Sequence, residues 1–224
     1  MIVPSMTLNE IHKELFDDLG TLESRIDSFH KDFKRKVLKS SSYPLSHTYD
    51  CRTKLKKNLF VVNLYASKRG DFEKPLIGIC GIYNRPEGNY LAALALEKNM
   101  TTIYPPHFFK RYRERILKEM KSSSEDIIKL YLHRNAWGFV AAPSDAKYQG
   151  LYNLFEAEMK DTNISFVCVN SEGFCFGEKL GNINLIKTII SEDMLIGEQK
   201  VVFAKLKEDF EISNKSMFGT RYSK

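Results

Sequence analysis

The residues best suited to chemistry lie in one short segment, PPHFFKRYRER at 105–115. His107, Arg111 and Arg115 are spaced four residues apart, which places them on one face of an α-helix that turns by about 100° per residue. Imidazole exchanges protons near neutral pH, and arginine can hold a phosphate through paired hydrogen bonds or stabilise its developing charge. Phosphodiester cleavage needs both functions, and the two cations should lower the pKa of the histidine, which favours its neutral, proton-accepting form.

The same segment also has a plainer interpretation. Phe108, Tyr112 and Ile116 form the neighbouring stripe, which should be the buried side of the helix. The basic residues would then lie on a solvated outer face, and His107 would be a helix-start residue without a catalytic task.

The elements that must position this segment begin with a predicted helical arm at residues 7–39. Apolar residues recur there at steps of three and four, from Leu8 to Val37. Thr7 and Glu10 have the spacing of a capping box, Gly20 interrupts the pattern, and residues 40–44 resemble a linker. An apolar stripe of this length must be buried, either on the body of the same chain or on another chain.

After the linker the apolar period changes to two. The runs at 58–65, 76–83 and 89–97 are separated by turn-forming residues, which predicts an antiparallel meander. Gly78 and Gly81 mark either a bulge or a close approach of another backbone segment.

The second half of the chain mixes helices and strands. Pro105 and Pro106 open a helix that should run to about residue 121. Further predicted elements are a helix capped by 122–126, a helix around 148–159, strands at 164–169, 173–180 and 183–191, and a helical stretch from Ser191 to about 211. The sequence therefore predicts an α+β protein, with a helical arm at 1–42, an α+β body with antiparallel strands at 43–212, and a flexible tail at 213–224.

A helical His-x-x-x-Arg-x-x-x-Arg pattern followed by antiparallel strands resembles the barnase/EndoU/colicin/RelE-like group of ribonuclease toxins. The resemblance covers roughly residues 100–190, and His107, Arg111 and Arg115 match its helical pattern. It implies RNA cleavage without a metal ion, with His107 as general base or acid. In several of these families a last strand contributes a Lys, Thr or Ser, and Lys187 and Thr188 match that contribution as phosphate-binding residues. The chain departs from the pattern in its helical arm, its extra meander, and the additional helix and segment 138–150 before the last strands.

Several of these residues have structural alternatives. Lys187 lies in an alternating strand and would equally suit a solvent-facing position. Ser191 precedes Glu192 and Asp193, which favours a helix cap over a phosphate contact. Tyr131 and Trp137 could stack on bases, although an aromatic residue beside Gly138 and Phe139 is more often part of a core.

Composition limits the choice of function. The chain has 224 residues, a formal net charge of +6 and 43% hydrophobic residues, so it can build a core and is compatible with RNA as a partner. Its four cysteines lack Cys-x-x-Cys spacing, which predicts free thiols and the cytoplasm. No run of residues is long and apolar enough to span a membrane.

Motif searches exclude several classes of enzyme. The sequence has no P-loop, no Gly-x-Gly-x-x-Gly, no His-Glu-x-x-His and no Gly-x-Ser-x-Gly, and we expect no cofactor and no metal site. Two hypotheses remain. One is an RNA-directed nuclease-like protein or an inactive relative of one. The other is a non-enzymatic interaction protein that uses residues 7–39 to bind a partner or to form a homodimer.

Overall fold

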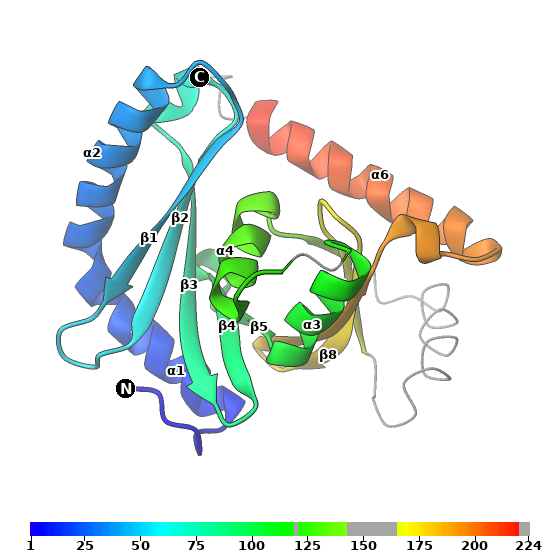
Figure 1. Ribbon diagram of the computed structural model, residues 1–224, viewed down its shortest axis with the longest axis horizontal. Helices are drawn as coiled ribbons and strands as arrows, with labels where there is room; N and C mark the ends of the chain where they lie inside the picture. Colours follow the sequence, from blue (N-terminus) through cyan, green and yellow to red (C-terminus); the bar gives the residue numbers. More distant parts are fainter. Residues whose placement is uncertain (119–120, 143–164, 220–224) are drawn as a thin grey trace.

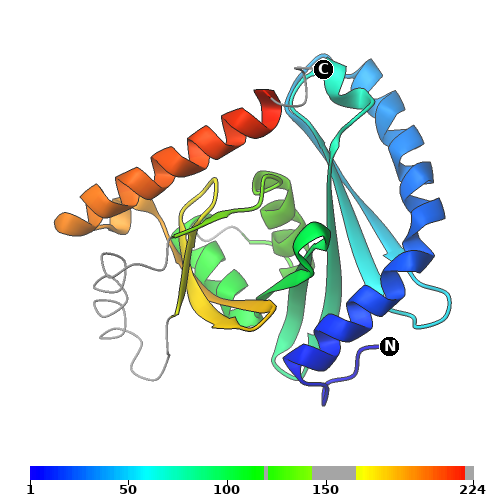
Figure 2. The same cartoon turned by 180° about the vertical axis from the view of Figure 1, so that it is seen from behind.

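The computed structural model describes residues 1–118, 121–142 and 165–219. These residues form a nine-stranded sheet with helices on both faces, which confirms the predicted α+β class (Figures 1 and 2). The strands are β1 (Leu45–Arg52), β2 (Leu59–Ala66), β3 (Leu76–Arg85), β4 (Gly88–Ala95), β5 (Met100–Tyr104), β6 (Val140–Ala141), β7 (Phe166–Val169), β8 (Phe174–Leu180) and β9 (Ile183–Ile190). The α-helices are α1 (Leu8–Asp18), α2 (Glu23–Lys39), α3 (Pro106–Arg115), α4 (Ser124–Arg134) and α6 (Glu198–Gly219).

The strands follow the order β1-β2-β3-β4-β5-β9-β8-β7-β6. Every neighbouring pair is antiparallel except β5 and β9, which run parallel between Thr101↔Ile183 and Ile103↔Leu185. The sheet therefore has two antiparallel halves, β1–β5 and β6–β9, joined by one short parallel pairing.

The predicted meander is present and longer than the sequence indicated. Strands β2, β3 and β4 correspond to the three apolar runs, whereas β1 and β5 were not predicted. β1 has few buried residues because it lies at the edge of the sheet. β5 is five residues long, which is too short to show a clear alternation.

Helices α1 and α2 lie along the outer side of β1–β4 (Figures 1 and 2). The capping box is confirmed, since the Glu10 N–H donates to the Thr7 hydroxyl and the Thr7 N–H donates to the Glu10 carboxylate. A short 3₁₀ helix, Leu19–Leu22, separates the two helices at the predicted interruption. The apolar stripe is buried on the chain's own sheet, with Ile11, Leu15, Leu22, Phe33 and Val37 at most 1% exposed.

At Gly81 on β3, the atoms that come close belong to a side chain rather than to another backbone. A Cβ atom built there would lie 2.6 Å from a methyl carbon of Leu15, so a larger residue would require the buried Leu15 side chain of α1 to shift. Gly78 has ordinary contacts only.

The arm also has a polar anchor. The buried carboxylate of Asp18 accepts hydrogen bonds from the Thr53 hydroxyl at 2.7 Å and from the Asn58 amide at 2.9 Å. Asp18 is 1% exposed, so its charge is met inside the protein, as a buried carboxylate requires.

Helices α3 and α4 lie between the two halves of the sheet (Figure 1). Their inner sides form an aromatic core with Tyr104 of β5, to which they contribute Phe108, Phe109, Tyr112 and Tyr131. The predicted buried stripe is thus confirmed at Phe108 and Tyr112, with Ile116 partly buried against the same core. Pro106 is the first residue of α3, as predicted, but the helix ends at Arg115 rather than near residue 121.

Helix α6 packs on β6–β8 through Phe203, Leu206 and Phe210. It begins at Glu198 and continues through Gly219, so part of the predicted tail is helical. Ser191 instead precedes the 3₁₀ helix Glu192–Met194 and makes no side-chain capping bond there, so the predicted cap at Ser191 is wrong. The helix predicted around 148–159 lies outside the described residues.

Candidate functional site

Helix α3 covers a free edge of strand β9. β5 pairs with β9 only as far as Leu185, so within the described residues Ile186–Ile190 have a strand partner on one side alone, which is β8. α3 begins directly after β5 and packs along this stretch. The sequence His107–Arg115 is therefore held against the part of β9 that contains Lys187 and Thr188.

A β-bulge lies at this edge. Phe176 of β8 is opposite Thr188, and the next residue, Gly177, is opposite Ile186, so Lys187 has no partner across the ladder. A Cβ atom on Gly177 would lie 2.0 Å from the Leu185 carbonyl oxygen, which explains why glycine stands there. A bulge redirects the side chain and main chain of the extra residue. The bulge at Lys187 therefore interrupts the alternation of inward and outward side chains that was expected for 183–191.

His107 lies in the first turn of α3 and is exposed to solvent on one side. Burial of its other side, which removes the imidazole from water, is the main cause of a lowered His107 pKa. The positive charges of Lys187 and Arg111 lower that pKa further. The main-chain carbonyl of Lys187 accepts from the ring and acts in the opposite direction. The net shift favours the neutral imidazole, as the sequence predicted for a histidine beside cations.

Arg115 contacts β9 at the other end of α3. Its Nη1 donates to the Thr188 hydroxyl at 3.2 Å and to the Ile189 carbonyl at 3.1 Å. Thr188 is 5% exposed. Arg115 therefore provides a hydrogen-bond donor for the Ile189 carbonyl. Its guanidinium holds α3 against β9 and also adds a positive charge there.

Arg111 differs from Arg115. It forms an ion pair with Glu114 at 3.5 Å, and its side chain is 52% exposed. A surface pair of this kind contributes little to stability, about 0–1 kcal/mol. The guanidinium of Arg111 can therefore exchange Glu114 for an incoming anion at small cost.

Lys187 is engaged rather than solvent-facing. Its ammonium group donates to the Glu178 carboxylate on β8 at 2.5 Å, and its side chain is 13% exposed. The alternative of an exposed Lys187 is thus wrong. The ion pair fixes the charge that helps to lower the His107 pKa.

A polar network behind α3 fixes the helix from its buried side. The Glu172 carboxylate, in the turn between β7 and β8, accepts from the Tyr112 hydroxyl at 2.5 Å and from the Arg134 guanidinium and the Asn135 amide, each at 2.8 Å. The network ties α3, the end of α4 and the β7–β8 turn together. Burial and the neighbouring carboxylate raise the pKa of Tyr112, which keeps its hydroxyl protonated as a donor.

The structure thus brings all five predicted residues to one edge: His107, Arg111, Arg115, Lys187 and Thr188. Glu178 and Glu172 were missed, because only the register of the β8–β9 hairpin and the turn before it places them there. Lys110 and Arg113 were also missed, although their three-residue spacing on the same helix was a visible signal. Tyr131 is a core residue, and Trp137 packs edge-on against Tyr65, so neither is presented for base stacking.

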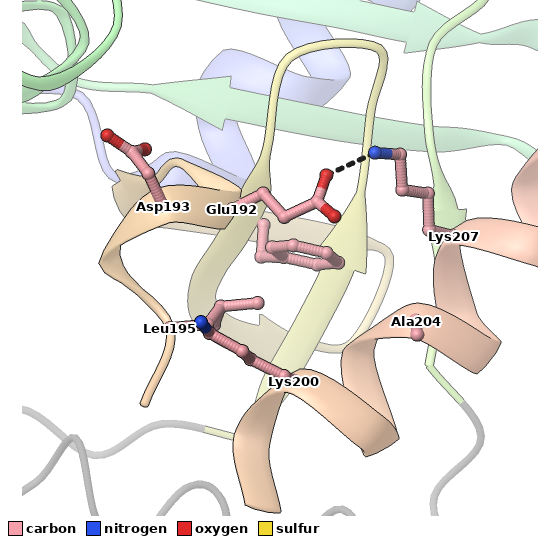
Figure 3. Close-up of a pocket in the computed structure, with 7 residues that line it drawn as sticks. Glu192, Asp193, Leu195, Lys200, Ala204 and Lys207 are labelled. Atoms are coloured by element: carbon pink, nitrogen blue, oxygen red, sulfur yellow. Dashed lines mark hydrogen bonds and ion pairs between the residues drawn. The ribbon is translucent and has the colours of Figure 1, made fainter. Parts of the chain in front are cut away.

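A hollow of about 440 Å³ lies elsewhere, between α6 and the segment after β9 (Figure 3). Its floor contains Phe174 and Leu195, and an ion pair between Lys207 and Glu192 lies across one side. Its described lining residues include no histidine, cysteine or hydroxyl side chain. The hollow lacks a group that transfers protons near neutral pH, so the α3–β9 edge remains the candidate site.

Residues 1–118, 121–142 and 165–219 contain neither a candidate metal-binding cluster nor a candidate membrane-spanning helix. No group of three or more His, Cys, Asp or Glu side chains there could hold a metal ion. No helix in these same ranges is long and apolar enough to cross a bilayer. The cysteines Cys51, Cys80, Cys168 and Cys175 are free and buried, as predicted.

Comparisons with protein-family models, with curated proteins and with solved structures find no match to this chain. The functional argument therefore depends on the geometry of the site.

Proposed function

We propose that this protein is an RNA-directed nuclease that works without a metal ion, with His107 as the proton-transfer group. The observation that carries the proposal is the placement of a solvent-reachable His107 on α3 near Arg111 and Lys187, with a pKa that is lowered mainly by burial and further by these two cations. A neutral imidazole beside an exchangeable guanidinium provides both a proton acceptor and an anion ligand.

The chemistry follows from the nature of RNA. With a phosphate held by Arg111, neutral His107 takes the proton of the adjacent 2′-hydroxyl, and the 2′-oxygen attacks phosphorus. The bond from phosphorus to the 5′-oxygen breaks, a 2′,3′-cyclic phosphate forms, and the departing 5′-oxygen takes a proton from water. Arg111 and Arg115 stabilise the charge on the phosphate oxygens during attack, and Lys187 and Thr188 form the wall behind it. The free cysteines suit this reaction to the reducing cytoplasm.

A cleavage assay with chelator present tests the proposal. The wild type should convert a single-stranded RNA to products with 2′,3′-cyclic ends and leave the DNA of the same sequence intact. His107→Ala should be slower by about 100-fold or more, the usual range for losing a general base. His133→Ala, another exposed helical histidine, is the matched control and should cleave normally. Intact RNA with the wild type, or equal cleavage by His107→Ala, would overturn the proposal.

The second hypothesis, partner binding or dimerisation through residues 7–39, depended on an apolar stripe in need of cover. That stripe is covered by the chain's own sheet, and Leu38 is the arm's exposed large apolar residue, at 37%. The structure therefore offers less support for partner binding or dimerisation through residues 7–39 than the sequence did. Light scattering of the intact protein addresses it directly, and we expect a monomer.

A further inference from the structure

A cavity adjoins His107. It lies between the β3–β4 turn, α3 and the start of α4, and has a volume of about 390 Å³. Ligand-binding cavities commonly have volumes of about 300–1,000 Å³. Its lining contains Glu87, Gly88, Asn89, Pro106, His107, Phe109, Lys110, Arg113, Ser124, Ile127 and Ile128. His107 thus lines this cavity and also interacts with Lys187 of β9.

The cavity combines an apolar floor with a cationic rim. Phe109, Ile127 and Ile128 supply the apolar part. Lys110 and Arg113 lie three residues apart on α3, which makes them neighbours on the helix surface at about 5–6 Å between Cβ atoms. Neither forms an ion pair with a carboxylate in residues 1–118, 121–142 or 165–219. Two unpaired cations above apolar carbon suit a ligand with a phosphate and a flat, weakly polar ring.

The polar groups on the turn side can discriminate between ligands. The Asn89 amide oxygen accepts a hydrogen bond from the Asn84 amide at 2.9 Å. The NH₂ group of Asn89 therefore points away from Asn84 and can donate to a ligand. The Glu87 carboxylate accepts from the Tyr90 hydroxyl at 2.5 Å, and this bond lowers its pKa. Glu87 is therefore ionised, and it places a negative charge opposite the two cations.

The walls of the cavity are held together. Gly88 has a φ of +130°, and a Cβ atom there would lie 3.2 Å from the Pro106 ring. The β3–β4 turn is thus in contact with the first residue of α3. The cavity is formed before any ligand arrives, which reduces the entropic cost of binding.

We propose that this cavity binds one nucleotide of the RNA strand, next to the phosphate that is held at His107. The nucleobase lies against Pro106 and the small exposed part of Phe109 and Ile127, with Ile128 buried beneath them, and the phosphate of that nucleotide is bound by Lys110 and Arg113. This inference rests on the proposed nuclease function, and it assigns to the enzyme a subsite distinct from the cleavage position. Lys110 and Arg113 act in binding, so their loss should raise KM more than it lowers kcat.

The test measures binding of 5′-AMP, adenosine and inorganic phosphate to the full-length protein by calorimetry. We expect 5′-AMP to bind more tightly than adenosine or phosphate alone. The double variant Lys110→Ala/Arg113→Ala should weaken 5′-AMP binding by about tenfold or more, because two charge-assisted contacts are lost. The charge-matched control Lys13→Ala/Lys31→Ala, with both residues exposed on the arm, should bind normally. Unfolding midpoints of both double variants report whether the fold is intact.

The outcomes separate the two proposals. RNA cleavage that depends on His107, with 5′-AMP affinity and RNA KM unchanged in Lys110→Ala/Arg113→Ala, overturns the subsite and leaves the nuclease standing. Binding of 5′-AMP that depends on Lys110 and Arg113, without any RNA cleavage, overturns the nuclease and leaves a nucleotide site. Phosphate that binds as tightly as 5′-AMP overturns the base-binding part of the inference.

Discussion

The charge buried beneath the first half of the sheet and the charges on the outer side of α3 are partnered in different ways. Beside β1–β4, the Asp18 carboxylate is buried and its hydrogen bonds come from Thr53 and Asn58. On the outer side of α3, Arg111 has a surface ion pair with Glu114, and Lys110 and Arg113 lack a carboxylate partner among the described residues. A charged side chain with hydrogen-bond partners inside the protein stabilises the fold. A charged side chain that is exposed and lacks such partners is available to a ligand. Under the proposed function, the Asp18 contacts serve stability and the exposed cations of α3 serve binding.

The largest expected effect concerns the first half of the sheet. Phe33→Ala should lower the free energy of unfolding by about 3–5 kcal/mol, because Phe33 is fully buried between α2 and the sheet. Urea unfolding measures this loss. Lys31→Ala on the exposed side of the same helix is the control and should change stability by less than about 0.5 kcal/mol. A loss at Phe33 as small as that of the control would mean that α2 is not part of the folded core.

Arg115 and Arg111 provide the next comparison, within α3. Arg115→Ala should cost about 1.5–3 kcal/mol of stability, because the charged contacts to Thr188 and to the Ile189 carbonyl disappear. Arg111→Ala should leave stability within about 0.5 kcal/mol and should reduce RNA cleavage. Equal stability losses in the two variants would contradict the distinction between a positioning arginine and an exchangeable one.

Acidification should weaken the fold. The pKa values of His12, His47 and His107 are lowered in the folded protein, mainly by burial. The folded state then binds fewer protons than the unfolded state near the ordinary histidine pKa of about 6.5. Stability is complete above that pH and is lost as the pH falls towards the lowered values. Urea midpoints at pH 7.5, 6.5 and 5.5 should decrease in that order, and His12→Asn should flatten the trend.

The smallest expected effect is on the titration of His107. NMR should give His107 a pKa below its usual value, and Lys187→Met should raise it, because a nearby positive charge is removed while Glu178 remains. Lys179→Met, on the exposed end of the same hairpin, should leave the His107 pKa where it was. If the His107 pKa is the same in Lys187→Met as in the wild type, then His107 does not interact electrostatically with Lys187 of β9.

The sequence predicted the elements that have strong local signals. The capping box at Thr7 and Glu10, the interruption at Gly20 and the helix start at Pro106 depend on neighbouring residues, and all three are present. The helix end was placed too late, because residues 116–121 lack a glycine or proline stop signal. The weak edge strand β1 and the short β5 were missed because pairing, rather than composition, makes them strands.

The site was predicted in part for the same reason. Helical periodicity alone groups His107, Arg111 and Arg115, and alternation alone suggests β9. The bulge at Lys187 and the partner Glu178 depend on the register of two strands, which no single stretch of sequence contains. The cavity beside Lys110 forms only where the β3–β4 turn contacts α3. That contact is made by folding, and no local sequence pattern indicates it.

The parallel pairing of β5 with β9 has a consequence for the order of folding. Its register joins residues more than 80 positions apart, from Thr101↔Ile183 to Ile103↔Leu185. The β1–β5 meander closes through short hairpins, which form quickly, whereas a long-range parallel contact forms slowly because a large loop must close first. His107 can therefore belong to a structured first half while the edge that completes its surroundings is still absent. We therefore expect the contacts between His107 and β9 to be among the last parts of the molecule to assemble.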